Sequence, residues 1–248
     1  LPSTPESLAV ALADKIETLT GLFGIGQLPT GEKDPFALRR HALGILRMLI
    51  EKELPLSLDK LIAIGTEEES VVPGVKDATE ELKQFFHDRL RVMQKDQGFT
   101  AHEVESVIGS EPAILADVPK RLKAVHDFMS LPEAESLAAA NKRIENILKK
   151  NTLPLADAVD PALLTEKEEK DLYEAIRTLE PKLEADYKAG RYEDELRSLA
   201  PLKAPVDAFF DKVMVNAEDE ALRRNRLTLL NELHKAMNQV AKLSCLAS

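Results

Sequence analysis

The sequence has 248 residues, of which 44% are hydrophobic and 31% are charged, and its formal net charge is −10. This length suits one large or two small domains with a real core, and these proportions are those of an ordinary globular protein. No apolar run approaches the about 20 residues that a membrane-spanning helix needs, and no secretory leader is present, so we expect neither a membrane protein nor a secreted one.

The acidic balance bears on partners, and the cysteine content bears on location. A net negative charge argues against a surface that binds nucleic acid everywhere, but it leaves room for local basic stripes. The single cysteine, Cys245, cannot form an internal disulfide, which fits a reducing cytosol, so we expect a cytoplasmic protein. The chain opens with Leu1 rather than methionine, and we interpret it as part of a longer protein.

Helix signals run along the whole chain, whereas strand signals are nearly absent. Helix starts, each a capping side chain followed by proline or by a glutamate three residues on, occur at Thr4-Pro5, Asp34-Pro35, Thr100 with Glu103, and Thr165 with Glu168. Asn216 is placed to cap the last helix. We therefore predict an all-α helical bundle, with helices over residues 5–23, 35–53, 75–97, 112–129, 132–150, 165–189, 201–215 and 217–244.

Two segments interrupt this helical pattern. Residues 54–74 contain Pro55, Gly65, three consecutive glutamates and Pro73-Gly74, all unfavourable for a helix. Residues 151–161 contain two prolines and no strong period. We therefore predict a first domain over 1–74 and a second over 75–248, with an articulation near 151–161.

The sequence shows no constellation typical of catalysis. The glycines of residues 21–26 follow a helix rather than a strand, so we expect them to end that helix rather than to hold a nucleotide. The five histidines lack the spacing of a zinc site. His87-Asp88 is similar to the HD pair of metal phosphohydrolases, and the alternative is a solvated helix face. Cys245 has no dedicated neighbouring base. We expect no catalytic and no metal-binding residue here.

Two longer stretches carry a family resemblance. ALADKIETLTGLFGIGQLPTGEKDPFALRRHALGILR, residues 11–47, resembles the end of the HD-like domain of the glycyl-tRNA synthetase beta subunit. AFFDKVMVNAEDEALRRNRLTLLNEL, residues 208–233, resembles the closing helices of a DALR-type anticodon-binding domain, which arginyl-tRNA synthetase shares. Residues 89–99 and 140–150 are similar to the same subunit, so the resemblance covers nearly the whole chain.

This resemblance implies tRNA binding and anticodon recognition within a ligase that joins glycine to tRNA(Gly) at the cost of ATP. It implies that glycine activation, with ATP and Mg²⁺, belongs to a separate alpha subunit in an α2β2 tetramer, so this chain alone is expected to be catalytically inactive. Neither a membrane nor DNA is an expected partner. Asp14 stands where a late-helix aspartate completes the metal site of HD phosphohydrolases. The alternatives are a remnant of such a hydrolase and a helical assembly scaffold that does not touch RNA.

Helical spacing separates the arginines of residues 35–53. Arg39 falls on the apolar arc, so we expect it to be structural and to have an acidic partner. Arg40 and Arg47 lie on the opposite flank, two turns apart, with Gly44 between them. They are placed to bind a phosphate backbone that approaches the glycine. The alternative is an exposed face on which Gly44 marks contact with another helix.

The C-terminal half offers three further basic clusters. In the last helix Arg226 falls among leucines, which predicts a paired core arginine, while Arg223 and Arg224 leave that arc. In helix 132–150 one polar flank has Lys142 and Lys149, and the other has Arg143 and Lys150. The candidate tRNA-binding residues are Lys33, Arg40, Arg47, Lys120, Arg121, Lys123, Lys142, Arg143, Lys149, Arg223 and Arg224.

Overall fold

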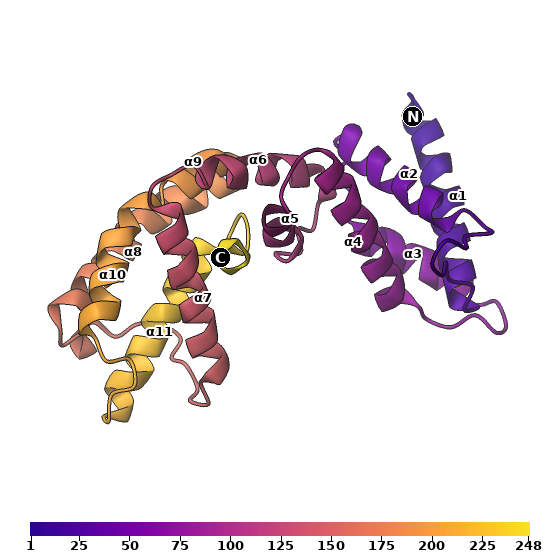
Figure 1. Cartoon of the computed structure of the whole chain (residues 1–248). Coiled ribbons are helices and arrows are strands. Elements are labelled where there is room, and N and C mark those ends of the chain that lie inside the picture. Colours follow the sequence, from indigo (N-terminus) through magenta and orange to yellow (C-terminus); the bar gives the residue numbers. More distant parts are fainter. The chain divides into compact units, whose positions relative to one another are not determined.

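The computed structural model describes residues 1–248 and contains helices but no strands, as predicted (Figure 1). Only two isolated bridges occur, between Thr30 and Lys33 and between Ser57 and Ile114. The chain divides into two compact units. Unit 1 comprises residues 1–104 and 111–119, and unit 2 comprises residues 105–110 and 120–248.

Unit 1 is built mainly from four helices: α1 (Pro5–Gly24), α2 (Leu38–Glu51), α3 (Leu58–Glu69) and α4 (Thr79–Asp96). Each of them packs against at least two of the others. Their contact faces supply a core that includes Leu19, Leu46, Ile62 and Phe86, all with fully buried side chains. The short 3-10 helix Leu115–Asp117 packs on α2. Helix α1 ends at Gly24, so the glycines of residues 21–26 end this helix as predicted.

Residues 54–74, where the sequence indicated an interruption of the helical pattern, contain helix α3, which the sequence analysis missed. The side chain of Ser57 caps the helix by accepting a hydrogen bond from the amide of Lys60. Gly65 lies inside the helix, where glycine normally costs about 1 kcal/mol relative to alanine. A Cβ on Gly65 would lie 2.8 Å from Cγ2 of Thr20 in α1, so the glycine permits close packing of α3 on α1.

The unit boundary differs from the division predicted near residue 74. Helix α4, which follows that position, packs on α1, α2 and α3 and completes the core of unit 1. The chain passes between the units three times, and helix α5 (Ala101–Ile108) spans the first passage and α6 (Val118–Phe128) the third. Local helix breakers therefore did not mark the boundary, because it depends on which helices pack together.

Unit 2 contains α7 (Ala134–Lys150), α8 (Lys167–Lys188), α9 (Tyr192–Arg197), α10 (Lys203–Lys212) and α11 (Glu220–Met237), followed by a 3-10 helix, Leu243–Leu246 (Figure 1). Helices α7 and α8 each pack against α10 and α11. Leu172, Ile176, Phe209, Leu230 and Leu233 are among the buried residues of these helices. The connection from α10 to α11 is short, residues 213–219.

Residues 151–160 are irregular, but they are held in place rather than articulated. The amide of Ala156 donates to the hydroxyl of Thr228 (3.1 Å), and the amide of Asp160 donates to the side chain of Asn225 (2.8 Å). The side-chain amide of Asn225 donates back to the carbonyl of Asp160 (3.0 Å). Helix α11 thus satisfies the backbone of this segment, and unit 2 continues through it.

The observed helix caps agree only in part with those predicted from the sequence. Thr100 and Glu103 form the predicted capping box, with hydrogen bonds of 2.7 and 3.2 Å. The start of α8 is shifted by one residue, because Glu166 with Glu169, rather than Thr165 with Glu168, forms its box. Asp219, rather than Asn216, caps α11. The side chain of Asp34 accepts a hydrogen bond from the amide of Leu38 at the start of α2, as a capping residue does. The helix itself begins at Leu38 and not at residue 35.

Candidate nucleic-acid interface

Arg226 is the paired core arginine that the sequence predicted. It is 4% exposed and lies beside Glu169, which is fully buried. Its Nε donates to Glu169 at 2.8 Å, its Nη2 to Glu166 at 3.0 Å, and its Nη1 to the carbonyl of Met214 at 2.7 Å. Burial raises the pKa of Glu169, but hydrogen bonds from Arg226 and from the amide of Glu166 outweigh it, so this pKa is lowered. Arg226 therefore joins α8 to α11 and is not available to a ligand.

Arg121 was predicted to contact tRNA, and the structure corrects this. Its guanidinium is buried on α6, 5.5 and 5.0 Å from the ring centres of Tyr187 and Tyr192. It donates to the carbonyls of Gln239 and Val240, at 3.1 and 2.8 Å. These carbonyls follow the C-terminal end of α11, where a cation is stabilising. Helical spacing alone did not show that a neighbouring helix end covers this face of α6.

The neighbours of Arg121 in that cluster remain at the surface. Lys120 and Lys123 are exposed and lie beside the turn around Arg191. Lys123 forms ion pairs with Glu193 and with Asp127. The hydrogen bond from Lys123 to Glu193 raises the pKa of Lys123, so this lysine already has a carboxylate partner. The cluster is thus less basic than its sequence suggests.

Helix α7 presents the most uniform basic surface in unit 2. Over its last three turns the exposed side chains are Ala139, Lys142, Arg143, Asn146, Lys149 and Lys150. These positions recur at intervals of three and four residues, so they form one face. The only carboxylate in this stretch, Glu145, is 15% exposed and points toward Lys242. The two flanks predicted separately are one surface, which we call the α7 basic face, and it also includes Lys150, which the candidate set omitted.

The four cations of the α7 basic face differ in their partners. Lys142 and Lys150 form no ion pair. Lys149 lies 2.9 Å from Glu145, although its side chain remains 67% exposed. The guanidinium of Arg143 lies over the ring of Phe210 in α10, 4.2 Å from its centre, and this contact restrains a residue that remains exposed. Arg143 is therefore preorganised to donate two parallel hydrogen bonds to an anion.

The carboxylate of Glu145, the one acid beside the α7 basic face, is bound by three donors. Partial burial opposes the effect, but hydrogen bonds from Ser244, Lys149 and Lys242 lower the pKa of Glu145 to about 2. It is therefore ionised and bound to three donors at neutral pH. The tail beyond α11 engages this acid, so two of the donors come from outside the helix. No spacing rule within α7 predicts that arrangement.

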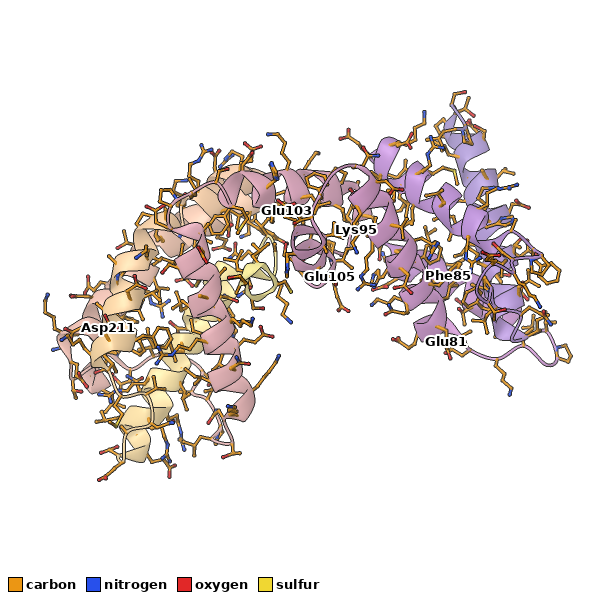
Figure 2. All side chains as sticks on the ribbon, viewed as in Figure 1. Glu81, Phe85, Lys95, Glu103, Glu105 and Asp211 are labelled. Atoms are coloured by element: carbon orange, nitrogen blue, oxygen red, sulfur yellow. The ribbon has the colours of Figure 1, made fainter.

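Arg223 and Arg224 are half-buried at the start of α11, less accessible than predicted. Arg224 pairs with Glu220 at 3.0 Å, and its Nε is buried without a hydrogen-bond partner. Arg223 forms no ion pair. Asp211, near the end of the neighbouring helix α10, adds an exposed carboxylate to unit 2 (Figure 2).

In unit 1, Lys33, Arg40 and Arg47 are exposed. Arg47 forms an ion pair with Glu51 at 2.6 Å, whereas Arg40 has no such partner. A Cβ on Gly44 would lie 3.0 Å from the side chain of Lys15 in α1. Gly44 therefore lies where α2 contacts α1, which is the alternative that the sequence analysis gave to a phosphate-binding site.

Arg39 is structural, but not in the predicted way. Its Nη2 donates to the carbonyl of Gly31 at 2.6 Å rather than to an acid. Asp34 instead accepts hydrogen bonds from the amides of Leu38 and Arg39, at 2.8 and 3.0 Å. The carboxylate is thus used to cap α2, and the guanidinium closes the loop before it.

The candidate metal residues do not come together. No three His, Cys, Asp or Glu side chains gather closely enough to hold a metal ion. Asp14 is exposed on α1. His87 is half-buried on α4, and burial, with smaller contributions from Arg91 and Lys83, lowers its pKa. None of the helices is both long and apolar enough to cross a membrane.

In comparison with known proteins, two family profiles match successive parts of the chain. Residues 1–109 match the family profile described as glycyl-tRNA synthetase beta subunit, and residues 137–244 match the DALR anticodon binding domain. The chain is 54% identical over its whole length to the glycine–tRNA ligase beta subunit of Delftia acidovorans. The chain belongs to the glycyl-tRNA synthetase beta subunit family.

Other members of the glycyl-tRNA synthetase beta subunit family are equally similar. The beta subunits of Polaromonas naphthalenivorans and Dechloromonas aromatica are 54% and 53% identical to the whole chain. The chain spans 35% of the length of each of these two relatives, and of the Delftia protein. The family resemblance found in residues 11–47 and 208–233 is thereby confirmed.

Proposed function

We propose that this chain is a tRNA-binding part of a glycine–tRNA ligase and that it contacts RNA through the α7 basic face. The observation that carries the proposal is the position of this face: the DALR anticodon binding domain profile covers residues 137–244, which include all four of its cations. The names of the relatives support glycyl-tRNA as the product of the whole enzyme.

The geometry of α7 suits a phosphate backbone. Lys142 and Arg143 lie two turns from Lys149 and Lys150, a rise of about 10 Å, so the two pairs are placed to reach different phosphates. Since the chain has a net charge of −10, RNA is repelled by most of the surface and attracted by this stripe. Asn146 lies between the two pairs and supplies a neutral donor and acceptor.

The test is a titration of the chain with tRNA(Gly) at several salt concentrations. Reversing Lys142 and Lys150 to glutamate should lower the affinity and reduce the salt slope by about two units, because each lost phosphate contact removes roughly one. The matched control reverses Lys167 and Lys170, which are exposed on α8 and give the same change in net charge. Equal losses in the two variants would refute the assignment of this face and leave only a general charge effect.

The remaining cations of the candidate set are expected to contribute less to RNA binding than the α7 basic face. Lys33, Arg40, Arg47, Lys120, Lys123, Arg223 and Arg224 stay candidates, but several already have carboxylate partners, so single reversals among them should have smaller effects. If wild-type chain shows no salt-dependent binding of tRNA, the alternative of a helical assembly scaffold is favoured.

We also propose that the chemistry lies outside this chain. ATP and Mg²⁺ would be used by an alpha subunit, in an α2β2 enzyme located in the cytoplasm. The purified chain should then show no glycine-dependent ATP–pyrophosphate exchange. Exchange that co-purifies with the chain and survives removal of host synthetases would contradict this.

A further inference from the structure

A second candidate binding surface lies in unit 1. Helices α2 and α4 border a groove of about 1140 Å³. The α2 side presents Arg40, Leu43, Arg47 and Ile50, which recur at helical spacing, and the α4 side presents Arg89, Val92, Met93 and Asp96. Figure 2 shows the side chains along α4, with Phe85 and Lys95 labelled near its middle and its end.

The floor of the groove is mainly aliphatic, and Phe99 is the one aromatic residue in its lining. Leu43 and Val92 are 38% and 47% exposed, and Ile50 and Met93 are half-buried beside them. A single exposed aliphatic residue needs no explanation, but four that line one concave surface do. Fully burying an exposed Val, Leu, Ile or Met side chain contributes about 1.5–3 kcal/mol, and each of these partly buried residues would contribute a fraction of that.

The rim of the groove has unmatched positive charge. Two of its three carboxylates are engaged, because Asp34 caps α2 and Glu51 pairs with Arg47. Arg40 is exposed without an ion pair, and Arg89 has none either, with its Nε buried and lacking a hydrogen-bond partner. Asp96 is exposed at the C-terminal end of α4. Arg40 and Arg89 therefore leave the rim with positive charge that no carboxylate of the chain pairs.

We propose that this groove docks an amphipathic helix of a partner protein, with apolar side chains on one face and carboxylates beside them. From Arg40 to Glu51 the groove follows α2 for about 16 Å, which corresponds to three turns of a bound helix. Apolar anchors at i, i+3 or i+4 and i+7 fit such a length. Carboxylates beside the anchors complement Arg40 and Arg89, whereas lysines in their place would be repelled.

The aliphatic floor favours a protein over RNA as the occupant. RNA surfaces present phosphates, riboses and flat bases, and proteins that bind single strands place aromatic side chains beneath those bases. Phe99, which is half-buried, is the one flat ring in the lining, whereas Leu43, Val92 and Met93 offer none. Arg40 and Arg47, which remain candidates for tRNA contact, would in this proposal pair with the acids of a protein helix.

The probe is a synthetic helical peptide of about 18 residues, five turns, with leucines at i, i+3, i+7 and i+10 and glutamates beside them. Its twin has lysines in place of the glutamates. Fluorescence anisotropy should show that the glutamate peptide binds the chain at least about tenfold more tightly than its twin. Leu43→Ser with Val92→Ser should weaken binding by at least about tenfold, and Arg40→Glu should reduce the preference for the glutamate peptide.

The matched control is Val10→Ser with Ile64→Ser, two exposed aliphatic residues of α1 and α3 outside the groove, which should leave peptide binding unchanged. Circular dichroism checks that each variant is folded. The K142E/K150E variant should bind the peptide normally, so failure of the tRNA proposal is distinguishable from failure of this one.

Three results would overturn the docking proposal. One is equal affinity for the two peptides or no saturable binding of either. Another is a loss of tRNA affinity in the Leu43→Ser, Val92→Ser variant that matches the K142E/K150E loss, which would identify RNA as the occupant. The last is a dimer of the chain in sedimentation equilibrium that this same double variant dissociates, which would identify a second copy.

Discussion

Replacing Arg226 with alanine should destabilise unit 2 severely. The substitution removes hydrogen bonds to Glu169, Glu166 and the carbonyl of Met214. The carboxylate of Glu169, which is fully buried, then has no charged partner. Breaking a buried ion pair by removing one partner costs about 3–5 kcal/mol, because the remaining charge is uncompensated. For a chain of this size each kcal/mol lowers the melting temperature by about 2–4 °C, so we expect a fall of roughly 6–20 °C.

The dependence on pH identifies the cause of that loss. Arg226 is the main group that lowers the pKa of Glu169, and burial acts in the opposite direction. A carboxyl group with a lowered folded-state pKa stabilises the protein above its unfolded value, and this contribution disappears as the pH falls through the folded value. In Arg226→Ala, Glu169 is free to take up a proton, so the deficit relative to wild type should shrink between about pH 7 and pH 4.

The assay is thermal unfolding followed by circular dichroism, with urea unfolding at pH 7 and pH 4. Arg223→Ala is the matched control, because Arg223 lies on the same helix and forms no ion pair. Its effect should stay within about 1 kcal/mol. The account of the Arg226 network would be refuted if Arg226→Ala melted within about 2 °C of wild type, or if its deficit were equal at both pH values.

Two further changes probe the core of each unit. Glu195 is fully buried; burial, followed by the charge of Asp186, raises its pKa to about 8. Because the folded state binds this proton more tightly, stability should fall as the pH rises from about 4.5 to 8, by up to about 1.4 kcal/mol per unit. Glu195→Gln should flatten that slope in urea unfolding, and parallel slopes would contradict it. Gly65→Ala should cost about 1–3 kcal/mol by overpacking against Thr20, whereas an unchanged urea midpoint would show that α1 and α3 separate freely.

The sequence by itself determined the fold class and most of the helices, because both depend on local chemistry. Apolar spacing and capping pairs act within a few residues, so Thr100 with Glu103 formed as predicted. Arg226 was also predictable, since a charged residue on an apolar arc requires a partner wherever that partner lies. The same reasoning placed the cations of α7, although it divided one face into two flanks.

Tertiary structure decided the matters that depend on distant neighbours. In the sequence, Gly65 indicated a break in the helical pattern. In the structure it lies inside α3, where its close contact with Thr20 of α1 leaves no room for a side chain. Arg121 seemed exposed on its own helix, but the carbonyls that follow α11 bury its guanidinium. The α7 basic face depends on Lys242 and Ser244, which bind Glu145 from beyond α11. Helical spacing describes one helix at a time, whereas burial and charge pairing depend on the helices and loops that pack against it.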